Sequence, residues 1–211
     1  TSVHGLYIEA SAPIYANVRH LVSNQAGSLT AKGKKALGKM FRAGIMRDIW
    51  SGASYRSVFV SVMASQDQTT ITFDDIKPGV VFYGTSKSGS PATTDPITIT
   101  LQANESYVIG LRGPYPGLGT DINDINGISI IADKPVAVAS GNWLGGPIYT
   151  GHQDIGIDQV VPVTLAGTEY VLLKGQAPST GTYGPTESPT VIALANDTYV
   201  YVNGSATPVN S

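Results

Sequence analysis

The sequence has no cysteine, only three histidines and no long apolar run. Without cysteine there are no disulfides, thiolate metal sites, iron–sulfur clusters or cysteine nucleophiles. No stretch approaches the roughly 18 consecutive apolar residues of a membrane helix, so we expect no direct membrane insertion. His4, His20 and His152 lie far apart in the sequence, which leaves few parts for histidine-based catalysis. These absences argue against most enzyme classes and against a transmembrane segment.

Short strands account for most of what is present. The 211 residues are 42% hydrophobic and 13% charged, with 24 glycines and 13 prolines that punctuate segments rich in Val, Ile, Thr and Tyr. Alternation with a period of two residues indicates β-strands, and frequent turn residues between them indicate an all-β, antiparallel β-sandwich. One weak helix is predicted at 29–46. Strands are predicted at 57–63, 69–73, 80–83, 97–101, 106–111, 128–131, 135–139, 170–173, 190–194 and 199–202.

Charge is distributed unevenly along the chain. Residues 1–56 hold eight of the 13 basic side chains and two of the 15 acidic ones, so this part carries +6 and the remainder −8. Such a basic segment attracts an anionic polymer or an acidic neighbouring domain, or forms a solvated loop. Nucleic acid is not an expected partner, because Gly33 and Gly38 interrupt a helix here and Phe41 is the only nearby aromatic that could stack on a base.

The chain matches itself at two spacings. Gly5, Ile8, Ala10, Pro13 and Ile14 match residues 122 positions later, and a second set matches residues 129 positions later. This predicts a sandwich built from an internally repeated unit of about 122–129 residues, with a first repeat at 1–126 and a second, truncated repeat at 127–211. We expect residues 1–37 to pack within the chain against either repeat, because Leu6, Tyr7 and Ile8 would otherwise leave an apolar edge strand exposed, and we expect a larger parent protein. The second set pairs 38, 41, 62–64, 67, 69, 71 and 73 with 167, 170, 191–193, 196, 198, 200 and 202.

Three ordered segments carry a family resemblance: NGISIIADKPVAV (126–138), GHQDIGIDQVVPV (151–163) and GTEYV (167–171). They resemble the IgGFc-binding-protein N-terminal type domain. FRAG (41–44) and SVMA (61–64) add similarity to giant gliding-motility adhesins of the Bacteroidota type. The resemblance implies an extracellular β-rich module of a cell-surface protein, exported by type IX secretion, used for attachment and without catalytic activity. No Fc-contact motif is recognisable, so Fc binding is not carried over.

A glycine-rich insertion at 142–159 is the best candidate for a ligand loop. Aromatic rings on such loops stack on sugars, which predicts a surface polysaccharide or glycoprotein as partner, beside other domains of the parent protein. In the alternative, Gly156, Ile157 and Val160 fold the loop back onto the core and Trp143 is a packing residue. The candidate ligand-binding residues are Trp143, Tyr149, His152, Asp154 and Asp158.

A second cluster, Asp121, Asn123 and Asp124, offers oxygen ligands for calcium. The pattern lacks the glutamate of an EF-hand, and the same residues are equally typical of turns before the strand at 128. No other cofactor is predicted.

Three functions remain at this point. The first is an adhesin module, and the second is a structural stalk or spacer with no ligand of its own. The third is a carbohydrate-active enzyme, which needs two carboxylates roughly 5–10 Å apart, drawn from Glu105, Glu169 and Glu187.

Overall fold

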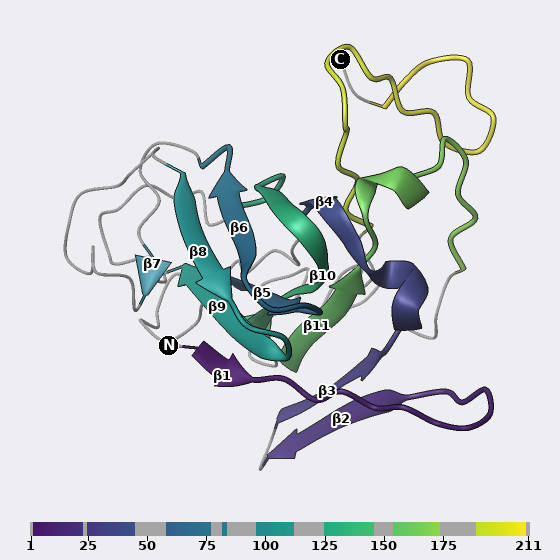
Figure 1. Cartoon of the computed structure of the whole chain (residues 1–211). Coiled ribbons are helices and arrows are strands. Elements are labelled where there is room, and N and C mark those ends of the chain that lie inside the picture. The colour runs from purple at the N-terminus through teal and green to yellow at the C-terminus, as the bar shows by residue number, and fades with distance from the viewer. Residues whose placement is uncertain are drawn as a thin grey trace.

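The computed structural model describes residues 2–22, 25–44, 58–76, 82–83, 96–111, 125–145, 154–173 and 189–209. Within these ranges the chain is all-β, with two short 3-10 turns and no α-helix, as the composition predicts (Figure 1). The elements are β1 (Ser2–His4), β2 (Asn17–Val22), β3 (Gln25–Thr30), η1 (Gly33–Ala36), β4 (Gly38–Arg42), β5 (Val58–Ala64), β6 (Thr69–Asp74), β7 (Phe82–Tyr83), β8 (Ile97–Leu101), β9 (Glu105–Leu111), β10 (Ser129–Gly145), β11 (Asp154–Val160) and η2 (Val163–Leu165).

The main sheet is antiparallel and is organised around β10. Its strand order is β1-β9-β5-β10-β6-β8, while β4 and β11 also pair with β10 and β7 pairs with β9. The first part of β10 lies between β4 and β6, and its second part lies between β5 and β11. Because one strand has four partners, the sheet curls around the core in a sandwich-like arrangement. A second, two-stranded sheet is formed by β2 and β3.

The change of partners along β10 occurs at Asp133, Lys134 and Pro135. Proline has no backbone N–H to donate to the ladder, and the register with β4 shifts between Ile131 and Val136. Asp133 accepts a hydrogen bond from the backbone N–H of Thr70 at 2.8 Å, and Lys134 Nζ donates to the carbonyl of Gln68 at 3.0 Å. These side chains fix the bend against the turn between β5 and β6.

The core lies inside the curl and consists of alternate residues from the paired strands. In β5 the buried positions include Val58, Val60 and Val62, and in β6 they include Ile71 and Phe73. This alternation is what a strand with one face on the core produces. The largest fully buried side chains are Phe41, Phe73, Ile71, Ile109, Ile125, Ile128, Ile130, Val60, Val62, Val136 and Val138.

Several predicted elements differ from the structure. The weak helix at 29–46 is wrong: this region contains the end of β3, η1 and β4, because Gly33 adopts a positive φ of 65° and Gly38 packs closely against Pro162. The predicted strands at 128–131 and 135–139 are one strand, β10. The insertion at 142–159 includes a strand, β11, rather than a continuous loop. The predictions missed the β2–β3 hairpin.

The three strands predicted nearest the C-terminus, at 170–173, 190–194 and 199–202, are also wrong. These residues have no strand pairing in the part of the chain that the structure describes. Their apolar side chains are largely exposed instead, as in Leu172 and Val191. A strand needs a hydrogen-bonded neighbour, and local propensity alone does not supply one. In contrast, β10, which follows position 126, pairs with strands that precede it.

Candidate binding surfaces

The β10–β11 ribbon holds three of the five predicted ligand residues. Trp143 lies in β10 where its register with β11 shifts, between Asn142 and Gly145, and Asp154 begins β11 opposite Gly145. Such bulges re-aim side chains and are common beside functional sites. Asp158 lies two positions from the end of β11. The other two predicted residues, Tyr149 and His152, lie outside the described residues.

Asp158 is joined to the basic segment through Lys32. The Nζ of Lys32 lies 2.9 and 3.0 Å from the two carboxylate oxygens of Asp158 and also contacts the carbonyl of Gln159. The backbone N–H of Lys32 donates to the side-chain oxygen of Gln159. The pair is largely exposed, so its contribution to stability is small. Its geometric effect is to hold the chain just after the β2–β3 hairpin against β11.

The interior of the ribbon is closely packed. Asn142 is fully buried, and its side-chain oxygen accepts a hydrogen bond from the backbone N–H of Gly156 at 3.2 Å. Ser140 is buried as well and donates to the carbonyl of Gly44 at 2.7 Å. A β-carbon on Gly141 would collide with the carbonyl of Gly156, so only glycine allows this approach. These contacts hold β10 and β11 rigidly together on the core.

Of the candidate metal and catalytic residues, the structure describes only Glu105 and Glu169. Asp121, Asn123 and Asp124 lie outside the described residues, and within those residues there is no group of three His, Cys, Asp or Glu that could hold a metal ion. The carboxylate of Glu105 accepts a hydrogen bond from the backbone N–H of Gln102 at 2.8 Å, within the turn before β9. Glu187 lies outside the described residues, and Glu169 is in the exposed C-terminal part of the chain.

Residues 5–16, here called the N-terminal segment, form an exposed apolar stretch, so the prediction that Leu6, Tyr7 and Ile8 pack within the chain is wrong. Leu6, Tyr7, Ile8, Ile14 and Tyr15 are each more than half exposed, and Tyr15 is completely so. Both ends of the segment are held by backbone hydrogen bonds. Gly5 donates to the carbonyl of Asn104 at 2.8 Å, and the carbonyl of Ala16 accepts from Ala31 at 2.9 Å.

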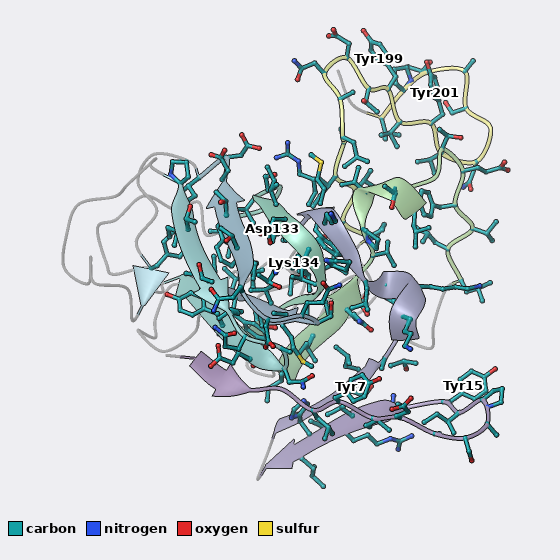
Figure 2. All side chains as sticks on the ribbon, viewed as in Figure 1. Tyr7, Tyr15, Asp133, Lys134, Tyr199 and Tyr201 are labelled. Atoms are coloured by element: carbon teal, nitrogen blue, oxygen red, sulfur yellow. The ribbon has the colours of Figure 1, made fainter. Side chains whose placement is uncertain are left out.

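Residues 166–173 and 189–209, here called the C-terminal segment, form a second exposed apolar stretch. In Figure 2, Tyr199 and Tyr201 of this segment lie on the side of the molecule opposite to Tyr7 and Tyr15. Large exposed apolar patches are uncommon on monomeric proteins and mark interaction sites. Side chains here that are at least about half exposed are Tyr170, Val171, Leu172, Leu173, Val191, Tyr199, Tyr201, Val202 and Val209.

The sequence profile of the family described as IgGFc binding protein matches residues 26–211. No curated protein and no solved structure matches the chain. None of the helical turns among the described residues has the length and apolarity that a membrane crossing requires.

Proposed function

Because the chain belongs to the IgGFc binding protein family, we propose that it is an extracellular β-rich module of a large bacterial cell-surface adhesin, active in attachment or gliding motility. The family match carries the proposal, because it extends from β3 through the entire remainder of the chain. A module of this kind binds or supports and does not catalyse. Type IX secretion is the export route proposed for the parent protein.

The β10–β11 ribbon is the proposed adhesive face, and the proposed ligand is a surface polysaccharide or glycoprotein. The buried hydrogen bonds of Ser140 and Asn142 support this assignment, since they hold the ribbon rigidly on the core. Sites on rigid elements lose less conformational entropy on binding. Trp143, at the register shift, supplies an indole ring of the kind that stacks on sugar rings.

Binding of the purified chain to an array of polysaccharides and glycoproteins, with IgG Fc among them, tests the proposal. Physiological ionic strength suppresses salt-sensitive attraction to the basic segment. The expected result is saturable binding that is lost in Trp143→Ala and retained in Tyr199→Ala, a matched aromatic control in the C-terminal segment. Circular dichroism verifies that both variants fold. Failure of the unmodified chain to bind any ligand would contradict the adhesive assignment.

A structural stalk or spacer is the second candidate. Two exposed apolar segments on opposite sides of the molecule favour it, because a spacer must join its neighbours at both ends (Figure 2). The same array experiment separates the candidates: a spacer binds no ligand, and its exposed segments bind other protein modules.

A further inference from the structure

Two hairpins of the structure have the same register at the two repeat spacings. In β10–β11, Ala139 lies opposite Gln159 and Asn142 lies opposite Gly156. In β2–β3, Asn17 lies opposite Thr30 and His20 lies opposite Gly27. The first residue of each pair is shifted by 122 positions and the second by 129, which are the spacings of the sequence matches. The hairpins are therefore equivalent in register, although the sequences of their strands differ.

The 3-10 turns after these hairpins also correspond. In η1 the backbone N–H of Leu37 donates to the carbonyl of Lys34 at 3.1 Å. In η2 the N–H of Ala166 donates to the carbonyl of Val163 at 3.0 Å, and both residues are shifted by 129. The order of elements from the N-terminal segment through β2, β3 and η1 is thus the same as the order from the first part of β10 through β11 and η2.

A third correspondence links the C-terminal segment to the turn between β5 and β6. The Oγ1 of Thr69 donates to the carbonyl of Gln66 at 2.7 Å, and the Oγ1 of Thr198 donates to the carbonyl of Ala195 at 2.8 Å. The residue before each threonine has a positive φ: 53° at Gln68 and 57° at Asp197. A second positive-φ pair follows at the same spacing, 57° at Asp75 and 71° at Gly204.

The two exposed segments are therefore the counterparts of strands that pair with each other in the core. The N-terminal segment corresponds to the first part of β10, and the C-terminal segment corresponds to β4, β5 and β6. In the sheet, Ile130 of β10 lies opposite Phe41 of β4 and Phe73 of β6, and all three are fully buried. Their counterparts are Ile8, Tyr170 and Val202, which are apolar and 53%, 67% and 49% exposed.

The second part of the pairing shows the same relation. Val136 lies opposite Ala64 and Val138 lies opposite Val62, and all four are buried. Their counterparts are Ile14 with Ala193 and Ala16 with Val191, again apolar in every case. The N-terminal and C-terminal segments therefore have apolar side chains at the positions that pair in the core between β10 and its neighbours.

We propose that the N-terminal segment of one copy of this chain pairs with the C-terminal segment of a second copy, in the register that joins β10 to β4, β5 and β6. Ile8 then lies between Tyr170 and Val202 of the second copy, as Ile130 lies between Phe41 and Phe73. The contact is head to tail. Each copy offers one N-terminal and one C-terminal segment, so association continues into longer chains or closes into rings.

The occupant is a second copy because the fold keeps the two segments of one chain apart. The N-terminal segment is held by β1 on β9 at one end and by the β2–β3 hairpin at the other. The C-terminal segment follows η2, which packs on β4, at the opposite side of the molecule (Figure 1). Pairing within one chain would require β1 and β2 to leave their partners. This proposal does not depend on the adhesive function proposed above.

Analytical ultracentrifugation of the unmodified chain and of two single variants tests the proposal. Ile8→Asp places a charge in the N-terminal segment and leaves the C-terminal segment intact. Val202→Asp does the reverse. We expect the unmodified chain to associate with rising concentration, each variant alone to remain monomeric, and an equimolar mixture of the two to form a 1:1 dimer.

Val209→Asp is the matched control, since it makes the same change in the C-terminal segment beyond the pairing register. We expect it to associate as the unmodified chain does. The proposal is overturned if the unmodified chain stays monomeric up to its solubility limit. A mixture of Ile8→Asp and Val202→Asp that stays monomeric also overturns it, and so does loss of association in Val209→Asp, which would indicate non-specific apolar clustering.

Discussion

The first part of β10 and the N-terminal segment have similar sequences and opposite environments. Ile130 and Val136 are fully buried between strands, whereas their counterparts Ile8 and Ile14 are more than half exposed. The apolar pattern is the same in both places. What differs is the presence of β4, β5 and β6 beside β10. Burial in this fold is therefore decided by which partner strands are present and not by the strand's own sequence.

Local geometry, in contrast, is retained in both regions. The hairpin register, the 3-10 turn and the threonine turn recur in both regions, although the burial of the two copies differs; Thr69, for example, is fully buried and the turn at Thr198 is exposed. The two kinds of turn depend on residues three positions apart. These turns are thus encoded locally, and the sheet adds the pairing between distant segments.

The largest expected effect on stability distinguishes the buried Phe41 from its exposed counterpart, Tyr170. Phe41→Ala should lower the free energy of unfolding by about 3–5 kcal/mol, because it opens a cavity in the core. Tyr170→Ala should change it by less than about 0.5 kcal/mol, because the ring is exposed in the monomer. Urea denaturation at protein concentrations low enough to prevent association measures both values. Equal losses in the two variants would contradict the assigned environments.

A second comparison uses two glycines. Gly141→Ala should destabilise the protein by about 1–3 kcal/mol, because the added β-carbon collides with the backbone carbonyl of Gly156. At Gly167, in the C-terminal segment, the nearest atoms lie 3.8 Å from an added β-carbon, so Gly167→Ala should be close to neutral. Thermal unfolding of the two variants provides the measurement. A neutral Gly141→Ala would mean that β10 and β11 are not in close contact.

The two threonine turns allow a finer test. Thr69→Val removes a hydrogen bond at a fully buried position and should cost about 1 kcal/mol. Thr198→Val removes the corresponding bond at an exposed position, where water replaces it, and should cost less. Guanidinium denaturation compares them. A larger loss in Thr198→Val would show that the exposed turn is stabilised by more than its own hydrogen bond.

The smallest expected effect concerns the charge on the outer face of the proposed pairing. The register that places Ile131 opposite Met40 places Glu9 opposite Glu169 of the second copy. Like charges directly opposite are unfavourable, and opposite charges contribute about 0.2–1 kcal/mol. Glu169→Lys should therefore strengthen association, and this gain should shrink with added salt.

The double variant Glu9→Lys with Glu169→Lys is the control, since it restores two like charges. Sedimentation equilibrium should return its association constant towards that of the unmodified chain. If the double variant associates as strongly as Glu169→Lys alone, the two side chains do not face each other and the register is wrong.

The sequence predicted the strands of the core well where alternation is strong, as in 69–73 and 97–101. It also contains matches to itself at spacings of 122 and 129 residues. It could not show that 170–173, 190–194 and 199–202 form no strand within the described part of the chain, because their propensity and pattern match those of true strands. The position of a partner strand is a tertiary property that the pattern does not contain.

Prediction of the candidate site was less complete for a related reason. The sequence predicts a loop around Asp154 and Asp158, because the glycines near them indicate irregular backbone. Gly156 instead lies in β11, where the absence of a side chain allows close approach to β10 at Gly141. The sequence does mark the two exposed segments as candidates for strand pairing, since they match strands that are buried in the core. The exposure itself becomes visible only when the partners of each strand are known.

Cross-linking between copies tests the central claim most directly. The proposed register places Tyr15 opposite Ile192, as Ala137 lies opposite Met63. Directly opposite Cα atoms in antiparallel strands are about 4.5–5.5 Å apart, within the range that a disulfide spans. Since the chain has no cysteine of its own, a mixture of Tyr15→Cys and Ile192→Cys should form one disulfide-linked dimer under oxidation. Tyr15→Cys mixed with Leu173→Cys, which is off register, should not form it. No cross-link above that control, or a link within one chain of the double variant, would contradict the account.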